Sequence, residues 1–176
     1  YTGEKDDFLR DLTKVRAIAA MPVCGRYRVI DFIVSSMVNS GMRNVGVIMQ
    51  KNYQSLMDHL GSGKEWDLHG KNDGLFILPP FLTADENNGV YKGSIDALHS
   101  NMGYLRRSRQ EYVLLTNSLI VYNANFTDAF AKFKQSDADI MMLYTRNPDM
   151  QRANYGAYLD VDADGIIRDV EVDPTK

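Results

Sequence analysis

The order of the local sequence patterns predicts an α/β fold, in which helices cover both faces of a mostly parallel, mixed sheet. Along the middle of the chain, short apolar runs alternate with longer segments of helical periodicity, as in proteins with parallel sheets. The apolar runs are nearly continuous, for example VLL at residues 113–115, which is typical of strands buried on both faces. Near the end of the chain, two alternating segments flank an Asp-Gly turn, and this pattern predicts an antiparallel hairpin.

Each expected element follows from its own pattern. Strands are expected where the apolar runs are short and rich in strand-forming residues, at 44–49, 74–78, 111–115 and 139–144. Helices are expected where apolar residues recur at helical spacing, at 31–40, 53–60, 94–107 and 127–135. The hairpin consists of residues 155–161 and 166–172, joined by DADG. Residues 79–90 form either a mobile loop beside the site or an ordinary connection.

The composition limits the class of protein. The chain has 176 residues, enough for a core, and we expect residues 1–176 to form one domain. Its net charge of −3 gives no electrostatic reason to expect a nucleic acid or a membrane as a partner. The single cysteine, Cys24, excludes an internal disulfide and indicates a reducing compartment, so we expect a cytoplasmic protein. No apolar run approaches the ~20 residues of a membrane span, and the start at Tyr1 suggests a fragment cut at both ends.

Four motifs identify a family. Residues 22–32 read PVCGRYRVIDF, and NSG follows at 39–41; YKGSIDA stands at 91–97, and residues 112–126 begin YVLL. Together they resemble the glucose-1-phosphate adenylyltransferase (ADP-glucose pyrophosphorylase) family. Residues 55–68 and 104–113 further resemble the D-type subunit of the bacterial enzyme, which accompanies a catalytic subunit in glycogen synthesis.

The resemblance implies a Rossmann-like nucleotidyltransferase domain whose first strand and carboxy-terminal β-helix lie outside this chain. It also implies a reaction in which glucose 1-phosphate attacks the α-phosphate of ATP, with Mg²⁺ held by carboxylates. Such chemistry depends on positioning and on neutralising many negative oxygens. It therefore needs a glycine-rich phosphate loop, one or two cations and a carboxylate for the metal.

The residues that should carry charge are replaced. By resemblance, Phe8 stands at the arginine of the phosphate loop, and Ile18 stands at a lysine, where we expect it only to pack. Leu119 stands at the aspartate that holds Mg²⁺, and leucine offers no oxygen to a hard cation. No shift of the alignment restores this carboxylate, because residues 116–125 (TNSLIVYNAN) contain no Asp or Glu. We therefore expect no catalytic residue, no metal site and no cofactor in this chain.

Other family positions are kept or hold neutral polar groups. The residual candidates for a substrate pocket are Gly3, Arg16, Gln50, Tyr91, Gly93, Ser94, Asp96, Asn117 and Ser118. Ligands in open sheets bind beyond the carboxyl ends of the strands, so we look after Met49, Leu78 and Leu115. Gly93-Ser94 could bind an anion at the start of a helix, or Ser94 could simply be an N-cap with Asp96 in the first turn.

Other signals have plainer explanations. Asp160, Asp162, Asp164, Gly165 and Glu171 match the ligand positions of an EF-hand loop, but their flanks alternate like strands, so a hairpin turn is favoured. The sequence GSGK at residues 61–64 lacks the other P-loop positions and is interpreted as a helix end with a loop.

Two further sets of residues do not define a site. The three histidines are too dispersed for a zinc site. Arg26 and Arg28 could face a phosphate or a subunit boundary, or could stabilise the fold.

The sequence therefore predicts a regulatory subunit that is catalytically weak or silent. We expect it to support ADP-glucose synthesis as part of a hetero-oligomer, expected to be a tetramer, with a catalytic ADP-glucose pyrophosphorylase subunit. One alternative is an active adenylyltransferase that recruits Asp96 or Asp31 to the metal. Another is a sensor that binds a sugar phosphate or a nucleotide and acts only through contacts with its partner.

Overall fold

The computed structural model describes residues 2, 9–71, 73–80, 91–119, 121–146 and 157–172. The candidate residues Gly3 and Phe8 lie outside the described residues, as does most of the 79–90 segment. The described chain divides into two compact units, Tyr1–Ser136 and Asp137–Lys176, and each is described by itself.

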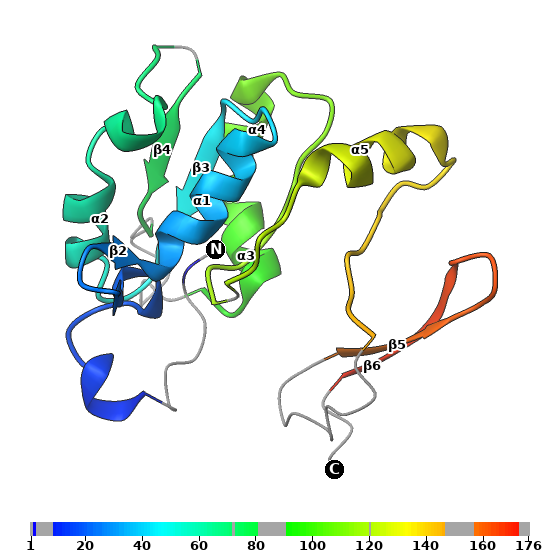
Figure 1. Cartoon of the computed structure of the whole chain (residues 1–176), viewed down its shortest axis with the longest axis horizontal. Helices are drawn as coiled ribbons and strands as arrows, with labels where there is room; N and C mark the ends of the chain where they lie inside the picture. The colour runs from blue at the N-terminus through cyan, green and yellow to red at the C-terminus, as the bar shows by residue number, and fades with distance from the viewer. Residues whose placement is uncertain are drawn as a thin grey trace. The chain divides into compact units, whose positions relative to one another are not determined.

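The first unit combines a parallel strand pair with helices and turns (Figure 1). Its helices are α1 (Val29–Asn39), α2 (Gln54–Leu60), α3 (Ser94–Ser100), α4 (Met102–Ser108) and α5 (Phe126–Gln135), with 3-10 turns at Arg10–Leu12, Ile18–Ala20 and Lys64–Trp66. Its strands are β1 (Pro22–Val23), β2 (Tyr27–Arg28), β3 (Val45–Ile48) and β4 (Leu75–Leu78). The second unit contains β5 (Ala157–Val161) and β6 (Ile167–Val172).

Strands β3 and β4 pair in parallel, with Val45 opposite Leu75 and Ile48 opposite Leu78. The expected strands at 44–49 and 74–78 are therefore confirmed. Val45 and Val47 of β3 are buried and belong to a core cluster that also includes Ile33 and Val34 of α1. Apolar burial of this kind is the main source of stability in such a domain.

Helix α4 packs close to β3 at a glycine. A Cβ on Gly46 would stand 2.6 Å from an atom of the Tyr104 ring, so only glycine leaves room for this contact. The Tyr104 ring lies 5.4 Å from that of Phe76 in β4, and its hydroxyl donates a hydrogen bond to Oδ1 of Asn44. Burial raises the pKa of Tyr104 to about 12, because the charged phenolate is poorly solvated there.

Helix α1 begins with a cap supplied by an aspartate of its own first turn. The Arg28 backbone N–H donates to Oδ2 of Asp31 at 2.9 Å, and Asp31 also complements the positive end of the helix. The expected helices at 31–40, 53–60 and 127–135 are confirmed as α1, α2 and α5.

The single helix expected at 94–107 is two helices instead. The break is at Asn101, whose φ is −104° and ψ is 15°. Its side-chain Nδ2 donates to the carbonyl of Ala97 at 2.8 Å, and its backbone N–H donates to Leu98, three residues back. Asparagine side chains compete with the backbone for such bonds, and this competition ends α3.

The strands expected at 111–115 and 139–144 are not formed in the structure. Leu114 packs against the core, but other apolar side chains of these segments are exposed, with exposed fractions of 53% for Val113, 60% for Leu115 and 79% for Ile140. The local patterns favour strands, but a strand also needs a neighbour to bond its backbone, and the described residues provide none here. The described sheet is therefore smaller than the mostly parallel, mixed sheet that was expected.

The hairpin expected near the end of the chain is confirmed. Strands β5 and β6 are antiparallel, with Ala157 opposite Val172, and Gly165 supplies the turn with a φ of +84°. Asp162 organises the turn, since its Oδ1 accepts from the N–H groups of Asp164 at 3.0 Å and Ile166 at 2.9 Å. Its Oδ2 accepts from Nε of Arg168 at 2.7 Å. The EF-hand pattern thus belongs to a hairpin turn, as the flanking sequence indicated.

The hairpin should lose stability in acid. The hydrogen bond from the Ile166 backbone, supported by Arg168 and the Asp164 backbone, lowers the pKa of Asp162 below 3.8. The ionised carboxylate therefore stabilises the hairpin at all pH values above about 4, and this contribution is lost as the pH falls through the lower pKa of the folded state. In an NMR titration, the Asp164 and Ile166 amide signals should shift together below about pH 4. Asp162→Asn should abolish this shared step and Asp164→Asn should retain it; an unchanged titration in Asp162→Asn would contradict the assignment.

Candidate functional site

The carboxyl end of β3 gathers segments that are distant in sequence. The Thr2 backbone N–H donates to the carbonyl of Ile48 at 3.1 Å, which brings the start of the chain to this end. Asn52, just beyond β3, donates from Nδ2 to the carbonyl of Thr13 at 2.9 Å, and its own carbonyl accepts from the N–H of Ala17 at 3.1 Å. The half-buried Arg16 therefore lies on a segment that Asn52 holds, by hydrogen bonds, near the carboxyl end of β3.

Sequence reasoning did not single out Asn52. Its φ of +51° is in the left-handed region, which asparagine tolerates better than most residues. One indication of this role was present in the sequence, because Asn52 stands three residues after the strand expected at 44–49.

Gln50 joins the segment after β3 to the segment before α3. Its side chain is 7% exposed, and its Nε2 donates to the Tyr91 carbonyl at 3.1 Å. The Tyr91 hydroxyl in turn accepts from Nδ2 of Asn101 at 3.3 Å. Two of the residual candidates, Gln50 and Tyr91, are thus in direct contact beyond the carboxyl end of a parallel strand, where open sheets bind ligands.

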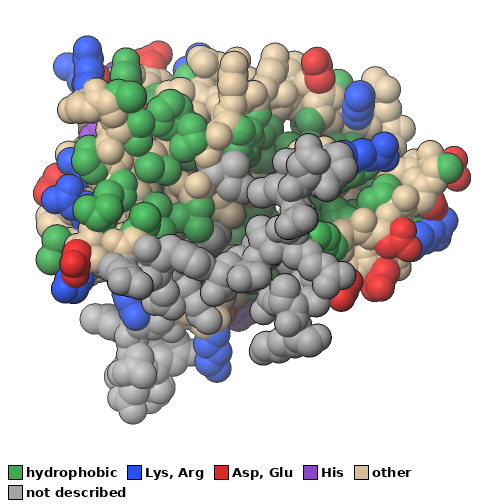
Figure 2. Space-filling view, turned by 60° about the horizontal axis from the view of Figure 1, so that its bottom comes forward, with side chains coloured by type: hydrophobic (Ala, Val, Ile, Leu, Met, Phe, Trp, Pro, Cys, Tyr) green, Lys and Arg blue, Asp and Glu red, His purple; other side chains and the backbone are tan. Residues whose placement is uncertain are grey.

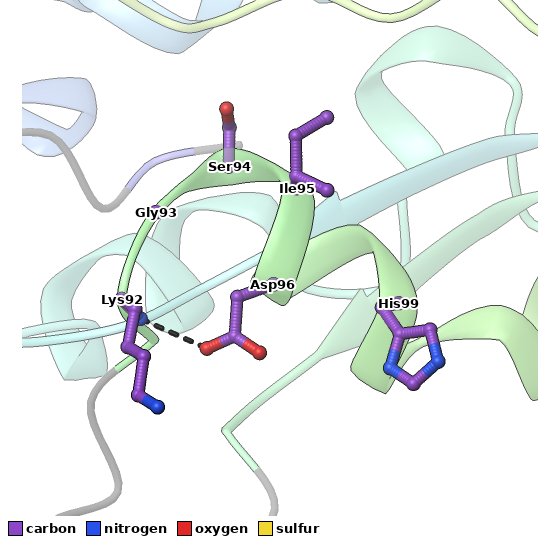
Figure 3. Close-up of a pocket in the computed structure, with 6 residues that line it drawn as sticks. All are labelled: Lys92, Gly93, Ser94, Ile95, Asp96 and His99. Atoms are coloured by element: carbon purple, nitrogen blue, oxygen red, sulfur yellow. Dashed lines mark hydrogen bonds between the residues drawn. The ribbon is translucent and has the colours of Figure 1, made fainter.

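The start of α3 lines a hollow of ≈ 590 Å³, formed by Lys92, Gly93, Ser94, Ile95, Asp96 and His99. Figure 3 shows Asp96 directed back toward the Lys92 backbone, whereas Ser94 and Ile95 point to the opposite side. Oδ2 of Asp96 accepts from the Lys92 N–H at 2.9 Å. Ser94 is not the N-cap that was considered: Gly93 holds that position, and no side chain caps the helix.

Gly93 is open to its surroundings. Its backbone is extended, with a φ of 176°, a conformation that does not require glycine. A Cβ at this position would meet no atom of the described residues within 4 Å. The fold therefore does not explain a glycine here, and the free space above the backbone could admit a ligand.

The segment after residue 115 carries neutral polar groups. Oδ1 of Asn117 accepts from the Leu119 N–H at 3.2 Å. Ser118 is only 2% exposed, and its hydroxyl oxygen has no hydrogen-bond partner among the described residues. Leu119, which the resemblance leads us to expect at the position of a metal-binding aspartate, is half-buried.

Among the described residues, those expected near a metal do not fit the Mg²⁺ that the resemblance implies. Leu119 has no oxygen, and Asp31 already uses both of its own: Oδ2 accepts from Arg28, and Oδ1 lies 2.6 Å from Nε2 of His59. Within the described ranges, no three His, Cys, Asp or Glu side chains lie together in a way that could hold a metal ion. Asp96 accepts through Oδ2 from the Lys92 N–H at the start of α3, so both carboxylates already support a helix end.

Arg28, which sequence left open between two roles, stabilises the fold. Its guanidinium donates from Nη1 to the carbonyl of Ser55 at 2.8 Å and to the Ser55 hydroxyl at 2.6 Å. It also reaches the Ala20 carbonyl at 3.4 Å, and so links the 3-10 turn at Ile18–Ala20 to α2. Ile18 itself is half-buried at the start of this turn, where an aliphatic side chain cannot neutralise a phosphate.

The remaining polar signals are accounted for in the fold. His59 contacts Asp31 and packs its ring against Trp66 with centroids 6.2 Å apart, while His69 and His99 are exposed. The GSGK sequence follows the end of α2 at Leu60, with Gly61 and Gly63 at positive φ, as expected for a helix end and a loop. No helix in the described part of the chain is long and apolar enough to cross a membrane. On the face that Figure 2 shows, the visible Lys and Arg side chains are scattered.

Comparison with known proteins agrees with this architecture. The chain is 40% identical over 144 residues to "Glycogen biosynthesis protein GlgD" of Bacillus subtilis (strain 168), which covers 81% of this chain and 41% of that protein. It is 36% identical over 165 residues to "Glucose-1-phosphate adenylyltransferase" of Thermotoga maritima, which covers 94% of this chain and 38% of that protein.

The chain thus spans less than half the length of these relatives. The model of one family, described as nucleotidyl transferase, matches residues 5–174, so the chain belongs to the nucleotidyl transferase family.

Proposed function

We propose that this chain is the nucleotidyltransferase-like domain of a regulatory subunit that supports ADP-glucose synthesis in glycogen biosynthesis without performing the reaction itself. Its partner is a catalytic glucose-1-phosphate adenylyltransferase subunit in a cytoplasmic hetero-oligomer. The similarity to a GlgD protein and to a glucose-1-phosphate adenylyltransferase supports the biosynthetic role.

The observation that carries the proposal is the absence of a carboxylate at Leu119. The reaction brings the negative oxygens of a triphosphate and a sugar phosphate together, and a bound metal would offset several kcal/mol of that repulsion. The neutral oxygens of Asn117 and Ser118 are weaker ligands for Mg²⁺ than a carboxylate. Ile18, which by resemblance stands where the family has a lysine, adds no positive charge there. The charged groups expected of the family are therefore missing at two separate positions.

Asp31, the carboxylate that an active enzyme could recruit instead, is already committed to the fold. Asp31 accepts hydrogen bonds at both oxygens, and it caps α1. Using Asp31 as a metal ligand would weaken the cap of α1, a helix that packs in the core. The expected loss is roughly 1–3 kcal/mol of folding free energy. This argues against an active enzyme with rearranged ligands.

The direct test is an activity assay on the full-length protein, purified alone and together with its catalytic partner. With ATP, glucose 1-phosphate and Mg²⁺, the protein alone should form ADP-glucose at least roughly a thousandfold more slowly than the catalytic subunit, since ~1.4 kcal/mol corresponds to a tenfold change in rate. In the mixture, the two proteins should co-purify, and the rate or its response to effectors should differ from that of the catalytic subunit alone.

Two variants sharpen this test. Leu119→Asp restores a carboxylate and should raise the residual rate, whereas the matched Leu119→Asn, of similar size but neutral, should not. Turnover by the unmodified protein alone within tenfold of the catalytic subunit would refute the proposal.

A second candidate, a sensor of sugar phosphates or nucleotides, is favoured by the hollow at α3. Gly93 has free space above its backbone, and the adjacent Tyr91 is held by the buried Gln50. A binding site without reaction chemistry needs only these positioning groups and a way to transmit the bound state to a partner.

The sensor role is tested by thermal shift without turnover. If ATP or glucose 1-phosphate binds there, it should raise the melting temperature through preferential binding to the folded state. Gly93→Ala should reduce that shift without lowering the melting temperature of the free protein, because its Cβ meets no atom of the described residues within 4 Å. Gly103→Ala, whose Cβ also meets nothing, is the matched control and should retain the full shift. Equal shifts in both variants would exclude ligand contact at Gly93.

A further inference from the structure

An exposed aromatic cluster lies where the segment after α4 meets α5. The ring of Tyr112 packs edge to face on Phe130, with centroids 5.1 Å apart, and on Phe133, with centroids 5.9 Å apart. Tyr112 and Phe130 nevertheless remain 40% and 42% exposed. Aromatic side chains are enriched at protein interfaces, because a rigid ring buries a large area at a small cost in conformational entropy. We call Tyr112, Phe130 and Phe133 the aromatic patch.

Basic side chains border the aromatic patch. Nζ of Lys134 lies 5.6 Å from the centroid of the Phe130 ring. Arg109 is exposed and stands three residues before Tyr112, which keeps their backbones within about 11 Å of each other. Neither cation forms an ion pair with a described residue. In the sequence RRSRQEY, which ends at Tyr112, three arginines stand against one glutamate, so the border of the patch is positive.

The geometry of α5 places Lys134 on this patch. The last turn of α5 carries both Lys132 and Lys134, and either cation complements the negative end of the helix dipole. At 3.6 residues per turn, Lys134 follows Phe130 by just over one turn and shares its face, whereas Lys132 is on nearly the opposite side. The dipole accounts for both lysines equally, but it does not account for the position of Lys134 over an exposed ring.

One face of the β5–β6 hairpin has the opposite charge. Its exposed residues alternate along both strands with apolar ones, and we call them the acidic face: Tyr158, Asp160, Asp169 and Glu171. Asp160 and Asp169 lie directly opposite each other, and like charges in this position destabilise a strand pair. Arg168, the one basic residue of the hairpin, is bound to Asp162 instead at 2.7 Å. The acidic face therefore carries three carboxylates that form no ion pair among the described residues.

We propose that the aromatic patch, together with Arg109 and Lys134, is a docking surface for the acidic face of a second copy of this chain. In this contact the two cations face carboxylates, and Tyr158 of the second copy packs on the exposed rings. A cation beside Asp160 and Asp169 also relieves the repulsion that the hairpin alone retains. Opposite charge selects the partner and its orientation, while the rings supply apolar area. The contact does not depend on the proposed regulatory function, because it rests on charge and exposure alone.

Cross-linking between copies tests the contact directly. Full-length protein grown with normal nitrogen is mixed at low concentration with protein grown with the heavy isotope, and the mixture is concentrated. A carbodiimide then joins lysine amines to adjacent carboxylates without a spacer. Peptides that contain Lys134 should be joined to hairpin peptides of the other isotope. Links at Lys134 confined to one isotope would overturn the proposal, because the contact would then lie within a single chain, and so would the absence of links between Lys134 and the hairpin.

Charge reversal gives a second, independent readout. Lys134→Glu should raise the dissociation constant of self-association about tenfold or more, because it replaces an attraction by a repulsion. The measurement is sedimentation velocity of the full-length protein. The matched control, Lys132→Glu, removes the same charge from the end of α5 but lies off the aromatic patch, so it should leave the dissociation constant unchanged. Equal effects of the two variants would contradict the assignment.

A reversal on the hairpin completes the test. Asp169→Lys places a cation opposite Asp160, which favours the folded hairpin, yet it should weaken self-association as Lys134→Glu does. Combined in one chain, the two reversals should restore the association, and failure to recover would overturn the proposal. Loss of association on nuclease treatment would also overturn it, because a nucleic acid bound at the basic and aromatic residues would then hold the copies together.

Discussion

The parallel pairing of β3 with β4 is the interaction on which the rest of the first unit depends. It buries Val45 and Val47 against α1 and requires Gly46 for the approach of Tyr104. It also fixes the position of Ile48, the last residue of β3. At that point Thr2, Thr13 and Ala17 are bound directly or through Asn52, and Gln50 holds Tyr91. One strand end thus assembles segments spread over ninety residues, in the place where open sheets bind ligands.

The polar groups near this end mostly serve the fold. Asp31 caps α1 and contacts His59, Arg28 joins α2 to a 3-10 turn, and Asp96 supports the start of α3. Ionised groups committed in this way are costly to redirect, because each would leave an unsatisfied partner. If the charges needed for phosphate chemistry are missing, as the proposed function holds, the fold of this family can still persist, since stability and catalysis draw on different residues.

The sequence predicted the elements whose pattern is local. Helix α1, strand β3 and the β5–β6 hairpin follow from periodicity and from turn residues such as Gly165. The predictions failed where a structure depends on residues distant in the chain. Residues 111–115 have strand propensity, but a strand forms only beside a neighbouring strand, and no local pattern reveals that neighbour. The end of α3 at Asn101 and the hydrogen bond from Asn52 to the Thr13 segment each depend on one side-chain amide. At the site, Gln50 and Tyr91 were predicted individually, while their contact emerged only from the structure.

We propose that the candidate site does not hold a divalent ion together with a nucleotide. The most direct measurement is binding of Mn²⁺, in place of Mg²⁺, to the full-length protein in the presence of ATP, followed by electron paramagnetic resonance. We expect the same free and ATP-bound Mn²⁺ with and without the protein, and a new protein-bound Mn²⁺ signal only in Leu119→Asp. A tight Mn²⁺–ATP signal in the unmodified protein would show instead that the site binds the metal without a carboxylate at Leu119.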